Sequence, residues 1–300
     1  MKKAVCYGIL SSLFFAVTFV LNRSMNLGGG FWMWSACLRY IIMLPLLAMV
    51  LQIQNRGAIG TVLASIRQQP GAWLLWSTVG FGLFYLPLTC ASVFGESWFV
   101  AASWQITIVC GVLLTPLFGK RIPLKNILTS LIILAGIALL QVTNLNGSGL
   151  SGSFPALLFI LIAAFSYPLG NRRMMQICPP GIDTTGRVFG MTLCSMPFWI
   201  VTAVIAFAVS GLPSAGQTVQ SAIVALSSGV IATILFFHAT EMVRDNPKQL
   251  ALVEATQCGE VLFTLLGGVL LLGDSIPGTV GMLGIALIVL GMILGSLVSI

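Results

Sequence analysis

The chain has 300 residues, of which 58% are hydrophobic and only 7% are charged, and its mean hydropathy is +1.04. A soluble domain carries about 25% charged residues, so this composition excludes one and indicates an integral membrane protein. The net charge of +7 does not indicate nucleic-acid binding, because the basic residues lie in short gaps between apolar runs, where they orient helices.

Ten apolar runs follow one another along the chain. Each is long enough for a helix that rises ~1.5 Å per residue to cross ~30 Å of hydrocarbon, and the gaps are too short for a separate soluble domain. The first run is longer than the apolar core of a signal peptide and no A-x-A-like site follows it, so we expect an uncleaved first helix. The runs cover residues 4–25, 31–51, 71–94, 97–118, 124–142, 154–174, 187–210, 218–243, 248–272 and 277–299.

The basic residues predict how these helices are oriented. If the N-terminus is cytoplasmic, all of the 14 Lys and Arg residues except Arg23 and Arg39 lie in or beside the inner segments. By the positive-inside rule, this bias predicts an all-α protein with ten transmembrane helices and with both termini inside.

Two short motifs recur at positions that pair each helix with the fifth one after it. F-G-K-R-I-P at 118–123 matches L-G-D-S-I-P at 272–277, and N-R-S-M at 22–25 matches N-R-R-M at 171–174. Because five is odd, the two halves would enter the membrane from opposite sides. Inverted five-helix repeats are typical of alternating-access carriers, whose site lies between the halves near the midplane. The predicted repeats cover 1–145 and 146–300, within one transmembrane domain.

The run 248–272 is apolar but carries Glu254, Gln257 and Glu260. At ~100° per residue these side chains form one polar arc over roughly a third of the helix circumference. Glu260 lies near the bilayer midplane, where ionisable groups are costly and are typical of substrate or proton pathways. Glu260 is therefore our first candidate for a substrate-binding or ion-coupling group. The alternatives are a structural pair with a buried cation and a permanently protonated hydrogen-bond donor.

The other two residues of the arc leave more than one interpretation open. Glu254 is either a second site in an inner vestibule or a side chain that reaches toward water near Lys248 and Arg244. Gln257 lies between the two acids and can either orient or bind.

Arg39 is the only basic residue well inside an apolar run, and a cation buried there needs a partner. If Arg39 reaches Glu260, the pair weakens the case for simple proton coupling. If it faces a cavity alone, it favours anionic groups such as carboxylate or phosphate.

Several further residues are weaker candidates. Trp104 with Gln105 lies deep in the fourth run and could form an aromatic wall for a flat or cationic ligand, and Tyr85 has a similar role in the third run. His238, the only histidine, is either hydrogen-bonded packing or a proton relay. Gly291 and Gly295 allow close helix contact within one chain or in a homodimer. The remaining tryptophans are expected mostly at the membrane interfaces; they include Trp32, Trp34, Trp73, Trp76 and Trp98.

The motifs together resemble the drug/metabolite transporter superfamily, in its ten-helix, EamA-like build. L-V-E-A-T-Q-C-G-E-V-L-F-T-L-L-G at 252–267 resembles more narrowly the putative multidrug resistance efflux transporter family. The resemblance implies a multi-pass carrier in the inner membrane of a bacterial cell that exports small molecules, such as lipophilic cations, in exchange for protons. The related four-helix multidrug pumps carry their essential Glu in the first helix. That helix has no acid here, which directs attention to the ninth.

No enzyme motif is present: the sequence has no H-E-x-x-H, no nucleophile elbow and no P-loop. The seven cysteines have no C-x-x-C spacing, so we expect no metal and no cofactor. The main hypothesis is a secondary exporter of lipophilic or cationic compounds. The alternatives are a metabolite exporter for amino acids or other anionic or zwitterionic solutes anchored by Arg39, and a membrane sensor or assembly protein that transports nothing.

Overall fold

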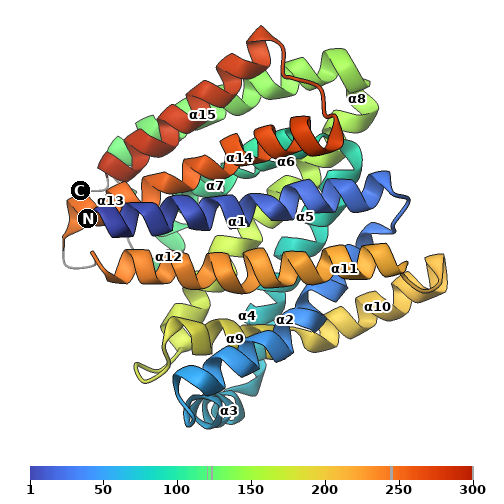
Figure 1. Ribbon diagram of the computed structural model, residues 1–300. Helices are drawn as coiled ribbons and strands as arrows, with labels where there is room; N and C mark the ends of the chain where they lie inside the picture. Colours follow the sequence, from blue (N-terminus) through green and yellow to red (C-terminus); the bar gives the residue numbers. More distant parts are fainter. Residues whose placement is uncertain (120, 123, 244–245, 299–300) are drawn as a thin grey trace.

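The computed structural model describes residues 1–119, 121–122, 124–243 and 246–298, and among these it contains helices and no strand (Figure 1). The first half contains α1 (Lys2–Leu27), α2 (Trp32–Gln54), α3 (Ala58–Gln68), α4 (Pro70–Ser77), the π-helical turn η1 (Thr78–Gly82), α5 (Leu83–Phe94), α6 (Ser97–Trp104), α7 (Ile106–Leu113), the 3₁₀ turn η2 (Thr115–Phe118) and α8 (Leu124–Ile177). The second half adds α9 (Thr184–Cys194), α10 (Met196–Ser210), α11 (Ala215–Val224), the π-helical turn η3 (Ala225–Ile231), α12 (Ala232–Glu241), α13 (Pro247–Ala255), the 3₁₀ turn η4 (Thr256–Cys258), α14 (Gly259–Gly267), the π-helical turn η5 (Gly268–Leu272) and α15 (Thr279–Val298).

The prediction of an all-helical membrane protein is confirmed. Within the described residues, eight helical stretches are long and apolar enough to cross a membrane. The pair α9–α10 becomes a ninth if it is one span, bent by 45° near Pro197, which lies in the first turn of α10 and has no N–H to donate. The stretch Ser97–Leu113 is apolar but shorter. Ten spans and cytoplasmic termini therefore stay predictions, although both termini lie at the same end of the molecule, as an even number of spans requires (Figure 1).

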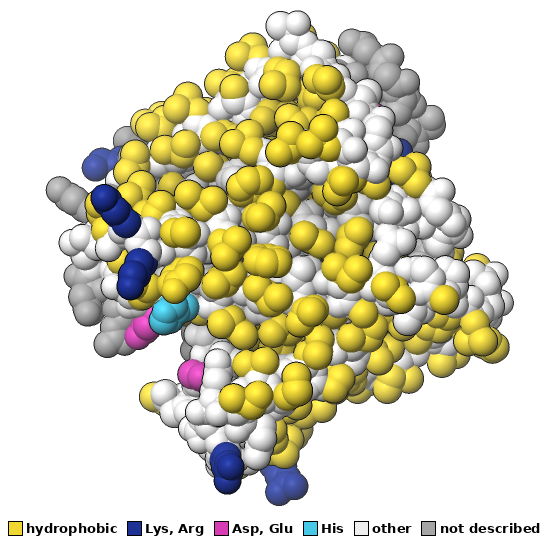
Figure 2. All heavy atoms as spheres, viewed as in Figure 1, with side chains coloured by type: hydrophobic (Ala, Val, Ile, Leu, Met, Phe, Trp, Pro, Cys, Tyr) yellow, Lys and Arg dark blue, Asp and Glu magenta, His cyan; other side chains and the backbone are white. Residues whose placement is uncertain are grey.

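The outer surface fits a lipid environment. Hydrophobic side chains cover most of the visible face, and the few Lys and Arg side chains lie at its margins (Figure 2). Such a surface would associate in water, whereas in a bilayer the apolar band contacts acyl chains and the cations reach the headgroups.

The fifth and sixth predicted runs are joined by helix, which the sequence analysis did not expect. The segment 143–153 was predicted as a gap, but α8 continues through it and is 54 residues long. Glycine lowers helix propensity by only about 1 kcal/mol per residue, so several glycines do not by themselves end a helix. Two parts of α8 are apolar enough to span a membrane, Lys125–Val142 and Phe154–Ile177.

The gap between the second and third runs contains a further helix that the sequence analysis missed. α3 buries Val62 and Ser65 and packs against α9. Ser65 Oγ accepts a hydrogen bond of 3.2 Å from Trp73 Nε1, and Trp73 is 0% exposed. The prediction that Trp73 belongs to an interfacial belt is therefore wrong, because its ring is covered by protein.

Two other tryptophans are also buried and join loops to helices. Trp34 Nε1 donates to the carbonyl oxygen of Gly211 at 2.9 Å, and Trp98 Nε1 donates to that of Ser275 at 3.0 Å. A buried indole needs a partner for its N–H, and these carbonyls supply it. Both rings tie the first half of the chain to the second.

Irregular helix turns occur at matching places in the two halves. The third run contains the π-helical turn η1 and the eighth contains η3. The fourth run is interrupted at Gln105 and the ninth at η4. These pairs are what the two-repeat interpretation expects, although the division at 145/146 stays a prediction and falls inside α8.

The recurring G-x-x-I-P motif has the same backbone conformation at its glycine in both copies. Gly119 has φ 72° and Gly273 has φ 69°, and both end a helical stretch in the left-handed region. Glycine adopts this region without steric cost, which explains the residue type at both positions.

Close packing of α15 against α8 depends on glycines. A Cβ added to Gly136 would lie 2.6 Å from the carbonyl oxygen of Gly284, and one added to Gly291 would lie 2.6 Å from Ile133 Cγ1. A Cβ added to Gly295 would lie 3.6 Å from Thr129 Oγ1 of α8, which is an ordinary contact distance. The Gly291 face is thus used within the chain, and the structure gives no support for a homodimer through it.

We therefore expect Gly136→Ala to destabilise the protein. The added methyl group meets a backbone oxygen that cannot rotate away, which should cost about 1–3 kcal/mol in the free energy of unfolding. Gly60→Ala is the matched control: Gly60 is helical but has nothing within 4 Å of the added Cβ. Thermal unfolding in detergent should show a lower Tm for Gly136→Ala and an unchanged or raised Tm for Gly60→Ala. Equal Tm values would refute this contact.

Candidate functional site

A cavity of about 500 Å³ lies between the two halves of the chain. Its lining runs from Arg39 and Trp104 to Asn126, near the start of α8, and Ser296, near the end of α15. Ser296 lies two residues before the end of α15, at the end of the molecule that holds both termini (Figure 1), and Asn126 lies near it because Thr129 of α8 faces Gly295. The cavity therefore extends from the interior toward that end.

Hydrogen bonds join the loops at the opposite end. The N–H and hydroxyl of Ser97 donate to the Asp274 carboxylate, and the N–H and hydroxyl of Ser275 donate to the Glu96 carboxylate. The N–H bonds measure 3.0 and 3.1 Å. Hydrogen bonds to charged acceptors are stronger than neutral ones, so this reciprocal set holds the two loops together.

Glu260 lines the cavity and is half-buried. Its Oε2 accepts a hydrogen bond of 3.4 Å from Gln105 Nε2, which also donates to the carbonyl oxygen of Ala101 at 3.2 Å. A bond of 3.4 Å is long and weak. Both residues lie at interruptions, Gln105 between α6 and α7 and Glu260 in the first turn of α14, just after η4. The irregular turns of the two helices are thus in contact at the cavity wall.

Arg39 lies in the same cavity with only 8% of its surface exposed. Its guanidinium carbon is 4.1 Å from the centre of the Tyr85 ring and 5.7 Å from that of Tyr40. Its Nε is buried and makes no hydrogen bond. Within the described chain Arg39 makes no ion pair, although its charge and that of Glu260 are near enough to interact.

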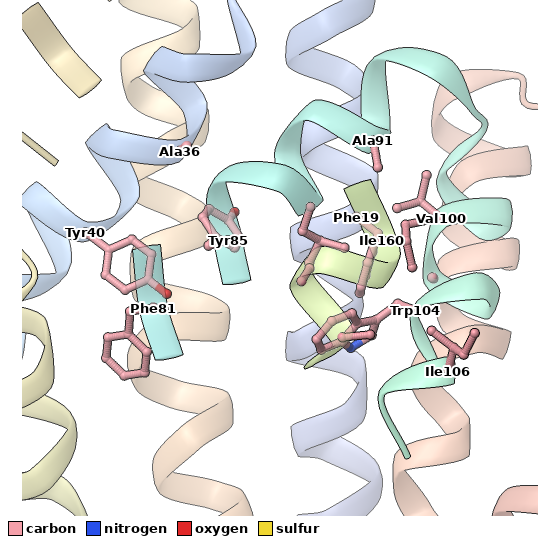
Figure 3. Packing of buried hydrophobic residues seen from close by; sticks show 14 of the residues in the cluster. Phe19, Ala36, Tyr40, Phe81, Tyr85, Ala91, Val100, Trp104, Ile106 and Ile160 are labelled. Carbon is pink, nitrogen blue, oxygen red and sulfur yellow. The ribbon is translucent and has the colours of Figure 1, made fainter. Parts of the chain in front are cut away.

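Aromatic rings connect the surroundings of Arg39 to those of Glu260. The Tyr85 and Phe84 ring centres are 5.8 Å apart, and Phe84 lies 5.1 Å from Trp104 and 4.8 Å from Tyr167. Figure 3 shows Tyr40 and Tyr85 together on one side and Trp104 on the other. We call Tyr40, Tyr85, Phe84, Trp104 and Tyr167 the aromatic wall.

The sequence candidates Arg39, Tyr85, Trp104, Gln105 and Glu260 thus come together. The remaining two residues of the polar arc also line the cavity: Glu254 and Gln257. Glu254 is exposed, whereas Gln257 Nε2 makes long contacts to α1, 3.4 Å to the Gly8 carbonyl oxygen and 3.5 Å to Ser11 Oγ.

His238 is not among the lining residues. It is exposed, and its ring lies 5.4 Å from that of Tyr7 on α1. The structure therefore gives a proton relay through the cavity no support at this position.

The sequence analysis missed several lining residues. Tyr40, Phe84 and Tyr167 belong to the aromatic wall, and Arg187, half-buried in α9, adds a second positive charge. Arg187 was predicted only as one of the basic residues that orient the helices. Tyr167 and Asn171 are polar residues four positions apart in the apolar sixth run, and Asn171 Nδ2 donates a hydrogen bond to the carbonyl oxygen of Tyr167. Their spacing on one helix face is the signal in the sequence that could have indicated Tyr167.

The described residues contain no group of three His, Cys, Asp or Glu side chains that could hold a metal ion. The cavity can instead offer two guanidinium groups, two carboxyl groups and flat aromatic rings to a small organic solute. Ligand sites of about 300–1,000 Å³ are typically built in this way, with few polar groups in an apolar lining.

Comparison with known proteins agrees with this description. Residues 2–300 match the family model described as "EmrE: Putative multidrug resistance efflux transporter". Uncharacterized protein YjlA of Bacillus subtilis (strain 168) is 50% identical over 314 residues, which cover 99% of this chain and 95% of YjlA. An uncharacterized 42.1 kDa protein of Shouchella clausii is 43% identical over 271 residues, covering 86% of this chain and 70% of that protein.

A solved structure titled "Crystal structure of protein" is similar to this chain, with a TM-score of 0.65 and 15% sequence identity. The matched region covers 98% of this chain and 96% of the chain in that structure. At this identity the similarity concerns the fold alone. The family match covers nearly the whole chain and describes transporters, not enzymes. The chain therefore belongs to the "Putative multidrug resistance efflux transporter" family of multi-pass membrane proteins.

Proposed function

We propose that this protein is a secondary carrier that exports small lipophilic or positively charged molecules by alternating access in exchange for protons. The observation that carries the proposal is the acidic Glu260, which faces a cavity that extends toward the end of the molecule holding both termini. A sensor or assembly protein without transport needs no such cavity.

Glu260 is the group to which we assign the exchange. Its protonated form is favoured when the cavity holds no cation, and a positively charged solute favours its ionised form. One carboxyl therefore binds either a proton or the solute, and this competition couples the two movements. Its one long hydrogen bond, from Gln105, leaves the carboxyl available to either.

The orientation follows from the charges of the sequence. With both termini in the cytoplasm and ten spans, the cavity is open to the cytoplasm, and the Ser97–Asp274 and Ser275–Glu96 bonds close the outer side. Export then requires those bonds to break while the inner mouth closes. We assign the protein to the bacterial cell (inner) membrane because the relatives that it matches are bacterial.

Glu260→Gln should abolish transport driven by a pH gradient, because an amide cannot release a proton. We expect at least a tenfold loss of uphill accumulation in proteoliposomes, with a lipophilic cation as the probe, while the mutant protein stays folded and monodisperse. Glu254→Gln is the matched control and should retain most of the activity, since Glu254 is exposed near the inner mouth. Full proton-driven transport by Glu260→Gln would rule out this assignment.

Accessibility tests the proposed orientation. In a variant without the seven native cysteines, Ser296→Cys should react with a membrane-impermeant maleimide only in inside-out vesicles. Ala215→Cys, at the exposed start of α11 near the opposite end, should react only in intact cells. A reversed pattern would show that the termini lie outside, and labelling of both residues from one side would contradict the arrangement of the helices.

A further inference from the structure

A groove of about 580 Å³ lies on the outer surface of the protein, between α1 and the pair α13–α14. It shares no lining residue with the central cavity. Leu252 and Phe263 form one wall. The other wall is one face of α1, whose residues recur at helical spacing: Lys2, Val5, Cys6, Ile9, Leu10 and Leu13. Lys2 carries the one charged side chain of the lining, so the groove is apolar apart from one end.

Small residues at the contact between the two helices explain why a groove forms. Gly8 of α1 lies against η4, and a Cβ added to Gly259 would lie 2.6 Å from Ser12 Oγ. Small side chains let two helices approach closely along a line. The larger side chains beside this line, such as Ile9 and Phe263, form the walls of the groove. Ile9 is 46% exposed, so the groove is open to the surroundings of the protein.

The length of the groove matches the depth of one leaflet of the membrane. Its α1 wall runs from Lys2 to Leu13, which is ~16 Å at ~1.5 Å rise per residue. The hydrocarbon layer is ~30 Å thick, so one leaflet contributes about half of that. α1 is long and apolar enough to cross the membrane, and Lys2 is its first residue. The groove therefore reaches from the membrane surface toward the midplane, on the side of the membrane where both termini lie.

Two lysines lie at the surface end of the groove. Lys2 lines it and Lys3 follows; both side chains are exposed, and in the described chain neither forms an ion pair. Figure 2 shows Lys or Arg side chains at the margin of the molecule where α1 begins, beside a hydrophobic surface. Lysine side chains near the end of a membrane helix extend into the headgroup layer, where they attract negatively charged lipids.

We propose that this groove binds one anionic phospholipid, with an acyl chain along its apolar walls and the phosphate at Lys2 and Lys3. Length, polarity and charge all fit this occupant: the apolar part is as long as one leaflet is deep, and the positive charges lie where the headgroup would be. A soluble anion would leave the apolar walls uncovered. Because the chain contacts both α1 and α14, the bound lipid should also stabilise their contact. The site is independent of what the central cavity takes.

A competition between two phospholipids tests the proposal on the unaltered protein. Protein purified in a mild detergent is mixed with equal amounts of phosphatidylglycerol and phosphatidylcholine that carry the same acyl chains, and bound lipids are counted by native mass spectrometry. We expect one retained phosphatidylglycerol per chain and at least about tenfold preference for it, since each lysine near a headgroup contributes about fivefold. Glycerol phosphate at millimolar concentration should not displace it. Phosphatidylglycerol should also raise the Tm more than phosphatidylcholine does.

Matched variants test the two ends of the site. Lys2→Gln combined with Lys3→Gln should remove the preference for phosphatidylglycerol, whereas Arg56→Gln combined with Arg67→Gln removes the same charge from exposed positions outside the groove and should leave the preference unchanged. All four side chains are exposed, so the fold should be retained.

A bulky side chain tests the apolar part of the groove. Ile9→Trp should fill it and lower the binding of phosphatidylglycerol about tenfold. Val204→Trp is the control, because Val204 is an exposed residue of α10 outside the groove. Lipid binding by this control should match that of the unaltered protein.

Four results would overturn the proposal. Equal binding of the two phospholipids by the unaltered protein would remove the selectivity, and an equal loss in the lysine and arginine variants would show a general effect of charge. Unchanged binding in Ile9→Trp would place the lipid elsewhere. Displacement by glycerol phosphate would show that the occupant is a soluble anion.

Discussion

Two opposite charges held in a membrane interior without an ion pair among the described residues are the constraint on which the structure depends. Arg39 and Glu260 face one cavity, where Arg39 stacks on Tyr85 and Glu260 accepts one long hydrogen bond from Gln105. The surrounding fold must keep them hydrated or bound, because bare burial of either would be costly. A cavity that extends toward one end of the molecule meets this requirement, and the same opening admits a solute.

Several of the helices that carry the site are irregular. Gln105 lies where α6 gives way to α7, Glu260 follows the 3₁₀ turn η4, and η1 and η3 widen the third and eighth runs. Interrupted helices expose backbone groups only where protein or a cavity covers them, and they supply positions that can bend. By contrast, α8 and α15 approach closely through Gly136 and Gly284, which gives the moving parts a firmly packed neighbour.

The sequence predicted the charged side chains whose free-energy cost depends only on how deep they lie in the membrane. A carboxyl or guanidinium inside an apolar run is unusual whatever it faces, so Glu260 and Arg39 could be identified, and both line the cavity. Hydropathy does not tell which way a side chain points between helices. Tyr167 and Arg187 were therefore missed, His238 lies on the surface, and α8 continues through a segment predicted as a gap.

Proton release on solute binding tests the central claim most directly. Purified protein in weakly buffered solution near neutral pH should release protons when a positively charged solute binds, as measured with a pH indicator. The release should disappear in Glu260→Gln at concentrations where the solute still binds. Binding without proton release, or equal release by Glu260→Gln, would contradict the exchange of proton and solute at this carboxyl.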